Sequence, residues 1–272
     1  MRSSGYCLVF VLAASVGCGD NLTHVERVAA ETGLPCAPNL DGTLTDAELP
    51  VLLGREARFR VATGVAVYLD GSVAADGRRT FSLRGNHAGE KVVGFTATPL
   101  AARWHASSFP GGMFVAPLDA AGAIEGVYSR SDDGVRLHGV ASRTETPEEG
   151  KTLLAYDPPA LVLPLPLRVG SAWLATARVE GGTLHGRPYA GTDRYEGHVA
   201  TFGELRLPEL TFAHVLQVRL KTTLSPSSGA PTVRHQAGFY AECFGEVARA
   251  TAADGDDRVA FTEASELRRF VP

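Results

Sequence analysis

From Ala57 onward, the chain consists of short β-branched or alternating apolar and polar runs that are separated by turn residues. Runs of this kind, bounded by glycine, proline and aspartate, are typical of β-strands. In a first block we expect strands at Ala57–Ala62, Val65–Leu69, Thr80–Leu83, Lys91–Thr96, Ala101–His105, Ile124–Ser129, Val135–Ser142 and Thr152–Tyr156. In a second block we expect longer strands at Ser171–Val179, Arg194–Phe202, Val215–Leu224, Thr232–Tyr240, Glu246–Thr251 and Val259–Thr262, followed by one helical turn over Ser265–Phe270.

This pattern predicts an all-β, mainly antiparallel domain over residues 51–272, either a sandwich or a half-open curved sheet or barrel. The clearest hairpin joins Ile124–Ser129 to Val135–Ser142 through the turn Ser131-Asp132-Asp133-Gly134. The 30 glycines and 16 prolines fit a chain with many turns, and an apolar content of 44% excludes a disordered one.

The stretch Asp157–Leu167 contains four prolines. Each proline removes a donor from the hydrogen-bond ladder, so we expect an extended edge or a crossing between sheets here, not a central strand. The stretch near 157–167 is also the best position for a boundary within the domain. A single sheet that runs through it is the alternative.

The N-terminus has the pattern of an export signal. Arg2 precedes the apolar run Tyr6–Ala14, and the small residues Ser15, Val16 and Gly17 follow. This order is typical of a secretory signal peptide over residues 1–17. The apolar run is about half of the ~20 residues that a membrane-spanning helix needs, and no later run is longer, so we expect no transmembrane anchor.

Cys18 resembles the acylated cysteine of bacterial lipoproteins, because it follows Val16 and Gly17, although Ser15 stands where leucine is usual. We therefore expect a lipid on Cys18 that anchors the protein in the cell envelope. Ordinary cleavage that leaves a free Cys18 is the alternative. Residues 18–50 are expected to form a tether, a short helix over Asn21–Gly33 with a capping box at its start, and a loop.

Two further cysteines are expected to pair. Cys7 leaves with the signal and Cys18 carries lipid, so Cys36 and Cys243 remain in an oxidising compartment. A disulfide between them would contribute about 4–5 kcal/mol in the chain-entropy model. Two small buried thiols are the alternative.

The segment Ala37–Glu48 resembles a twelve-residue calcium loop of the EF-hand or dockerin type. A hard cation needs six to eight oxygens that converge on one loop. In this register the oxygens would come from the side chains of Asn39, Asp41 and Glu48, the carbonyl of Thr43 and a water on Thr45. Ala37 replaces the first carboxylate, however, and the alternative is a structural loop in which Thr45 and Glu48 cap a helical turn.

Three other observations bear on function. The eight histidines have no metal-ligand spacing in the sequence, although His138, His198 and His235 could converge from different strands. No nucleophile elbow, His-Glu-x-x-His motif or phosphate-binding glycine loop occurs, so no catalytic residue is predicted. The formal net charge is −4 and basic residues form no stripe, which argues against nucleic-acid binding.

Three passages of the second block resemble uncharacterised exported lipoproteins of the myxobacterial type. They are Pro164–Trp173, which reads PLPL-x-x-G-x-x-W, Phe202–Pro208 and Tyr240–Ala248. The resemblance covers about Tyr156–Arg269 and implies strands and turns, with no assigned activity.

We expect a non-enzymatic envelope lipoprotein that binds an apolar ligand or an envelope partner. A carrier of this kind should have a cavity lined by Val, Leu and Phe of the second-block strands. The alternatives are a structural or interaction module with a packed core, and an envelope hydrolase whose site residues come from different strands. No cofactor is expected apart from the calcium ion discussed above.

Overall fold

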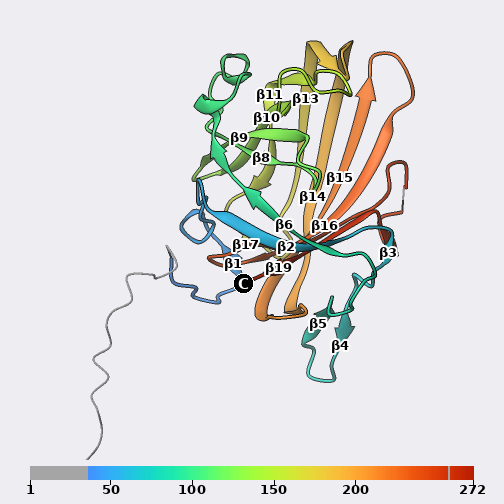
Figure 1. Ribbon diagram of the computed structural model, residues 1–272. Coiled ribbons are helices and arrows are strands. Elements are labelled where there is room, and N and C mark those ends of the chain that lie inside the picture. The colour runs from blue at the N-terminus through green and yellow to red at the C-terminus, as the bar shows by residue number, and fades with distance from the viewer. Residues whose placement is uncertain (1–35, 257) are drawn as a thin grey trace, which may run out of the picture. The chain divides into compact units, whose positions relative to one another are not determined.

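Fifteen strands join into one large, mainly antiparallel sheet in the computed structural model, which describes residues 36–256 and 258–272 (Figure 1). The strands of its first half are β2 (Glu56–Ala62), β4 (Ser72–Val73), β5 (Arg79–Ser82), β6 (Lys91–Thr96), β7 (Thr98–Pro99), β8 (Phe114–Pro117), β9 (Ile124–Ser131) and β10 (Gly134–Ser142). Those of its second half are β11 (Leu153–Pro164), β13 (Ala172–Leu184), β14 (Arg187–Arg206), β15 (Thr211–Pro226), β16 (Thr232–Ala241), β17 (Gly245–Thr251) and β19 (Glu266–Val271).

The strand order is β6-β2-β19-β17-β16-β15-β14-β13-β11-β10-β9-β8-β7, and β5, with its partner β4, pairs in parallel with β14. Two short pairs lie outside this sheet: β1 (Thr43–Leu44) with β12 (Leu167–Arg168), and β3 (Val65–Ala66) with β18 (Glu263–Ala264). The described chain also has three 3₁₀ turns, η1 (Asp46–Glu48), η2 (Leu100–Ala102) and η3 (Ala106–Ser108).

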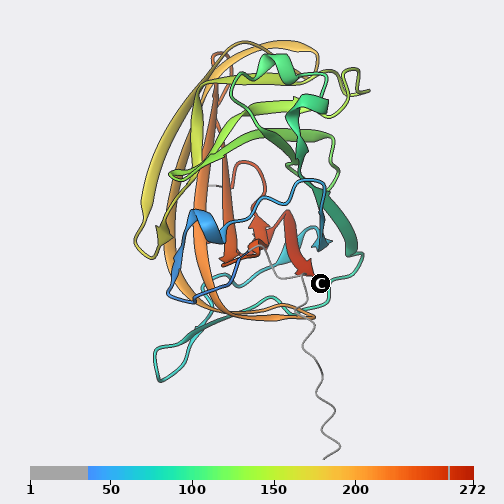
Figure 2. The same cartoon turned by 90° about the vertical axis from the view of Figure 1, so that its left-hand side faces the viewer.

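The sheet curls into a nearly closed, barrel-like form, with the long strands β13 to β15 bending around one side (Figure 2). Its end strand β6 approaches β8 without pairing to it. The predicted all-β, antiparallel class and the half-open barrel are therefore confirmed. The predicted N-terminal helix Asn21–Gly33, the signal peptide and Cys18 lie outside the described residues.

The proline-rich stretch is an interior strand, so the prediction of an edge or a crossing is wrong. β11 lies between β10 and β13, and the sheet continues through it. The register with β10 jumps from the pair Leu137↔Ala160 to the pair Gly139↔Ala155. Pro158 and Pro159 therefore fall in a bulge, where the ladder needs no donor from them.

Three local predictions are also wrong. Ala101–His105 is not a strand: it begins in the 3₁₀ turn η2 and continues as turn residues to the start of η3. Leu100 and His105 are both buried, and their odd spacing would put them on opposite faces of a strand. The expected helical turn over Ser265–Phe270 is β19, which pairs with β17 on one side and β2 on the other. Val259–Thr262 is not a strand, and β18 follows directly after it.

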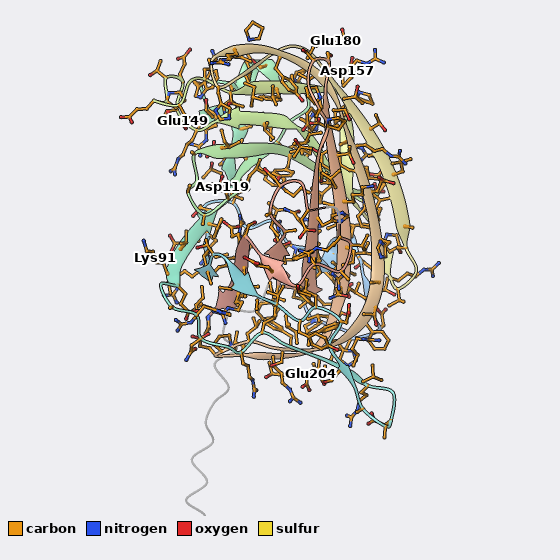
Figure 3. All side chains as sticks on the ribbon, turned by 90° about the vertical axis from the view of Figure 1, so that its right-hand side faces the viewer. Lys91, Asp119, Glu149, Asp157, Glu180 and Glu204 are labelled. Atoms are coloured by element: carbon orange, nitrogen blue, oxygen red, sulfur yellow. A yellow bond between two sulfur atoms is a disulfide. The ribbon has the colours of Figure 1, made fainter. Side chains whose placement is uncertain are left out.

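The two faces of the curved sheet carry different cores. Alternation along β15 sends Val215 to the outer face, where it packs with Phe81 and Phe239 beneath the segment 65–83. Leu216 and Val218 point to the inner face and pack in a separate cluster. Charged side chains such as Glu149, Glu180 and Glu204 lie at the periphery of the molecule (Figure 3).

One glycine permits a close approach on the inner face. Gly197 of β14 lies opposite Trp173 of β13, and a Cβ atom at Gly197 would be 2.1 Å from the indole ring. The tryptophan of the PLPL passage therefore packs flat across the neighbouring strand.

Candidate functional site

A segment that we call the strap, residues 36–53, crosses the inner face of the sheet (blue in Figure 2). The predicted disulfide between Cys36 and Cys243 is present and fixes its start. The backbone N–H groups of Asn39 and Leu40 donate to Glu242 Oε2 at 2.8 and 2.7 Å. The strap is therefore clamped to the turn between β16 and β17.

The residues predicted to bind calcium form hydrogen bonds within the strap. Asn39 Oδ1 accepts from Asp41 N at 2.9 Å, and Asp41 Oδ1 accepts from Thr43 N at 2.7 Å. Glu48 Oε2 accepts from both N and Oγ1 of Thr45, at 2.9 and 2.7 Å. These are the contacts of the structural alternative, a chain of turns followed by a capped 3₁₀ turn. Calcium binding by these residues stays a prediction.

The three histidines that could converge lie on separate strands. His138 Nε2 is 2.7 Å from Ser129 Oγ at the β9–β10 hairpin. His198 lies opposite Arg219 on β15, and His235 lies opposite Lys221 on the same strand. Across residues 36–256 and 258–272, no three His, Cys, Asp or Glu side chains gather as a metal site would require.

Two leucines of the strap fill the inner face of the second-block strands. Leu44 is 1% exposed and Leu49 is 7% exposed. We call the residues that they cover the inner strip: Leu163, Leu165, Leu167, Val199, Leu216 and Val218. In this region the apolar residues that were expected to line a ligand cavity are covered by the chain itself.

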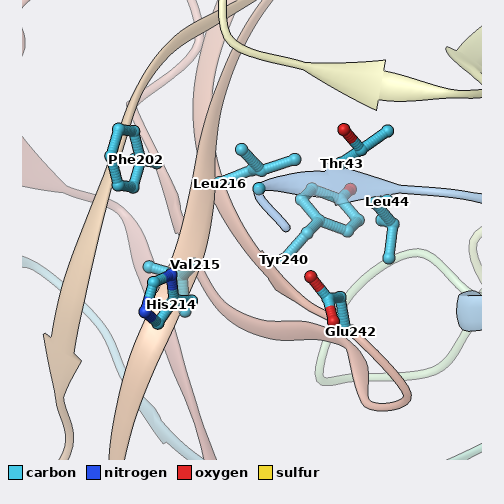
Figure 4. A pocket seen from close by; sticks show the side chains of 9 residues that line it. Thr43, Leu44, Phe202, His214, Val215, Leu216, Tyr240 and Glu242 are labelled. Atoms are coloured by element: carbon cyan, nitrogen blue, oxygen red, sulfur yellow. The ribbon is translucent and has the colours of Figure 1, made fainter. Parts of the chain in front are cut away.

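A narrow slot remains at one side of the strap. Figure 4 shows it between Leu44 of the strap and Leu216 and Tyr240 of the sheet. Its volume is about 20 Å³, which is close to the space that one water molecule needs.

A larger hollow lies at the other side of the strap and has a volume of about 420 Å³. Its apolar wall consists of Val51, Leu53, Met113 and Phe114, and its polar rim of Asp46, Arg130, Ser131 and Asp132. Met113 is 58% exposed and Leu53 is 47% exposed, so the apolar wall faces solvent. The strap thus provides one side of the hollow, and β8 with β9 provides the other.

An ion pair joins the strap to the rim of the hollow. Arg130 Nη2 lies 2.6 Å from Asp46 Oδ1 and also donates to the Asp46 carbonyl. Arg130 is on β9 and Asp46 is in η1, so this pair holds the two sides of the hollow together.

A polar cluster lies behind the apolar wall. The Phe114 ring stacks on Tyr128, with ring centroids 5.6 Å apart. Burial raises the pKa of Tyr128, which also lies in the field of Arg249 and Glu246. Arg249 Nη2 is 2.7 Å from Glu246 Oε2. Burial lowers the pKa of Arg249, but Glu246 together with Tyr240 and Tyr128 raises it more, so Arg249 stays charged.

A second buried cluster lies further along the inner face. Tyr156 Oη donates to Asp193 Oδ2 at 2.6 Å and lies 2.9 Å from Tyr195 Oη. Asp193 is 1% exposed, and its Oδ1 has no hydrogen-bond partner among the described atoms. Burial raises the pKa of Asp193 above its usual value, and the hydrogen bond from Tyr156 opposes this effect.

A third buried group ties the 3₁₀ turns η2 and η3 to the sheet. Arg103 Nη2 lies 2.7 Å from Glu125 Oε1, and His105 Nε2 lies 3.8 Å from Glu125 Oε2. Burial raises the pKa of Glu125, but His105 and Arg103 lower it more, so its net shift is downward. No sequence pattern indicates this group, because Arg103 and His105 lie between η2 and η3 whereas Glu125 is on β9.

No family model matches the chain, and no curated protein or solved structure matches it either. The resemblance to exported lipoproteins therefore stays a prediction. Within residues 36–256 and 258–272, no helix has the length and hydropathy that crossing a membrane requires.

Proposed function

We propose that the protein is an exported envelope lipoprotein, tethered at Cys18, that binds an apolar ligand without catalysing a reaction. The hollow beside the strap is the observation that carries this proposal. Its volume of about 420 Å³ lies within the ~300–1,000 Å³ of small-molecule sites. An apolar wall with a few polar groups at its rim is also the usual composition of such sites.

The location rests on two observations. Residues 1–18 have the order of a lipoprotein signal. A disulfide such as Cys36–Cys243 persists in oxidising compartments and is rare in the cytosol. Both support an envelope protein held at the membrane by its N-terminal lipid.

One observation favours a second candidate, a structural or interaction module with a packed core. Leu44 and Leu49 fill the inner strip, so the chain completes this part of its core without a ligand. In that case the exposed side chains around the hollow, such as Met113 and Leu53, would contact a partner protein.

A titration with an apolar fluorophore separates these candidates. We expect N-phenyl-1-naphthylamine to bind the full-length protein with enhanced fluorescence. Met113→Glu should weaken binding by about tenfold or more, because it places a charge in the apolar wall. Val73→Glu is the matched control, since Val73 is 56% exposed and lies on β4, outside the hollow.

The control variant should bind as tightly as the unchanged protein. If the fluorophore does not bind, or if both substitutions weaken it equally, the hollow is not a ligand site. The packed module would then be the better account.

A further inference from the structure

The slot and the hollow lie on the two sides of one short piece of chain. Gly42, Thr43 and Leu44 line the slot, whereas Asp46, Val51 and Leu53 line the hollow. Between them runs the part of the strap that presses Leu44 and Leu49 onto the inner strip. The two openings are thus separated by these two side chains and the backbone that carries them.

The inner strip is apolar along its length, forms part of the wall of the slot, and ends close to the rim of the hollow. Leu216, a member of the strip, also lines the slot. At the other end, Val135 packs against the strip and lies opposite Arg130, which lines the hollow. Without the leucines of the strap, the apolar strip would be uncovered between the hollow and the slot.

The strap is weakly integrated into the sheet. Its only ladder in the described chain is the two-residue pairing of β1 with β12, outside the large sheet. Its remaining attachments are the Cys36–Cys243 bridge, the Glu242 clamp, the bond from Cys243 N to the Glu48 carbonyl, and the Asp46–Arg130 pair. A few side-chain contacts and one covalent bond therefore decide whether the groove is covered.

We infer that the ligand site extends beneath the strap and that its ligand is a long, unbranched apolar chain, which replaces Leu44 and Leu49 on the inner strip. This inference rests on the proposed function, because the chain enters from the hollow. The apolar contacts between the ligand and the strip offset the cost of exposing Leu44 and Leu49 to water. The Cys36–Cys243 bridge keeps the strap close and limits how much of the groove a ligand can use.

Chain-length dependence tests this inference. Straight-chain alcohols from hexanol to dodecanol would compete with the bound naphthylamine in three forms of the full-length protein. The forms are the oxidised protein, the Cys36→Ser/Cys243→Ser variant, and the Leu44→Ala/Leu49→Ala variant with its bridge intact. Each methylene that reaches an apolar surface should tighten binding about fourfold.

In the oxidised protein we expect the gain to continue past the chain length that fills the hollow and to stop where the bridged strap covers the strip. In both variants the gain should continue through longer alcohols, because the strap is released in one and its leucines are removed in the other. If the cysteine variant does not fold, the leucine variant decides, and circular dichroism identifies that case.

The same length limit in all forms that fold would overturn the inference and leave the proposed function intact. If no alcohol displaces a bound fluorophore from any form, the inference fails. If the fluorophore itself binds to no form, the proposed function fails with it. Hydrogen exchange adds an independent criterion: the amides of Asn39 and Leu40 should lose protection when dodecanol binds, and unchanged protection would contradict strap displacement.

Discussion

Asp193 shows how a buried polar side chain on the inner face depends on a single partner. Its carboxylate is almost fully buried and receives a hydrogen bond from Tyr156 at one oxygen only. Burial raises its pKa, so the folded protein loses stability as the pH rises from the usual aspartate range through that raised value. The hydrogen bond from Tyr156 limits this loss, because it favours the ionised carboxylate.

We predict that Tyr156→Phe lowers the free energy of unfolding by about 1–3 kcal/mol at neutral pH. The loss should be smaller in acid, where Asp193 is protonated and no longer needs a donor for its charge. Urea unfolding at a series of pH values measures this. Tyr68→Phe serves as control, because Tyr68 is 65% exposed and lies outside this cluster. A loss that does not change with pH would contradict this role of Tyr156.

Sequence alone could place only part of this cluster. Asp193 and Tyr195 are two residues apart on one strand, so alternation puts them on the same face. Tyr156 joins them across β13, which separates β11 from β14 in the sheet. That strand order depends on long-range pairing, and no local pattern contains it.

At the scale of elements, the predicted strand bounds are correct where the β-propensity of the residues and the pairing with neighbouring strands agree. Lys91–Thr96 has the predicted bounds: it is rich in β-branched and aromatic residues, and every one of its residues pairs with β2. β11 shows the opposite case: its prolines exclude a regular ladder, yet a bulge removes the conflict. The position of such a bulge is set by the neighbouring strands, which the residues of β11 themselves do not reveal.

The 3₁₀ turns η2 and η3 depend on a buried ion pair, and this gives a prediction for Glu125. We expect Glu125→Gln to lower the free energy of unfolding by about 1.5–3 kcal/mol at neutral pH, because Arg103 loses its charged partner. The pKa of Glu125 is lowered in the folded protein. Its contribution is therefore complete above the usual glutamate pKa and is lost as the pH falls through the lowered value.

Thermal unfolding at pH values from neutral to acidic measures the difference in stability between the unchanged protein and Glu125→Gln. This difference should become smaller in acid. Glu145→Gln makes the same chemical change at an exposed carboxylate, 3.9 Å from Lys151, and should cost at most about 1 kcal/mol. Equal losses from the two substitutions would mean that Glu125 is not held as a buried charge.

At the scale of the whole domain, the sheet joins distant parts of the chain. β19, at the C-terminal end, pairs with β2, and β2 pairs with β6. Pairing between strands that follow one another in the chain accounts for the neighbours from β8 to β11 and from β13 to β17. The β19–β2 pairing that nearly closes the barrel cannot be predicted in this way. Hydrophobic alternation is a local property and does not identify the strand with which a given strand pairs.

The Cys36–Cys243 bridge acts at this same scale, because it closes a loop of 207 residues. In the chain-entropy model such a bridge contributes up to about 4–5 kcal/mol by restricting the unfolded chain.

We therefore predict that Cys36→Ser/Cys243→Ser lowers the urea midpoint of the main transition. Below that midpoint, the strap should exchange its amide protons faster than the sheet, since without the bridge few contacts hold it. Hydrogen exchange with mass spectrometry at increasing urea separates the two effects. If the urea midpoint falls and the amide protection of the strap is unchanged, the bridge acts on the unfolded chain alone. If the strap exchanges faster and the midpoint is unchanged, the bridge acts only to hold the strap.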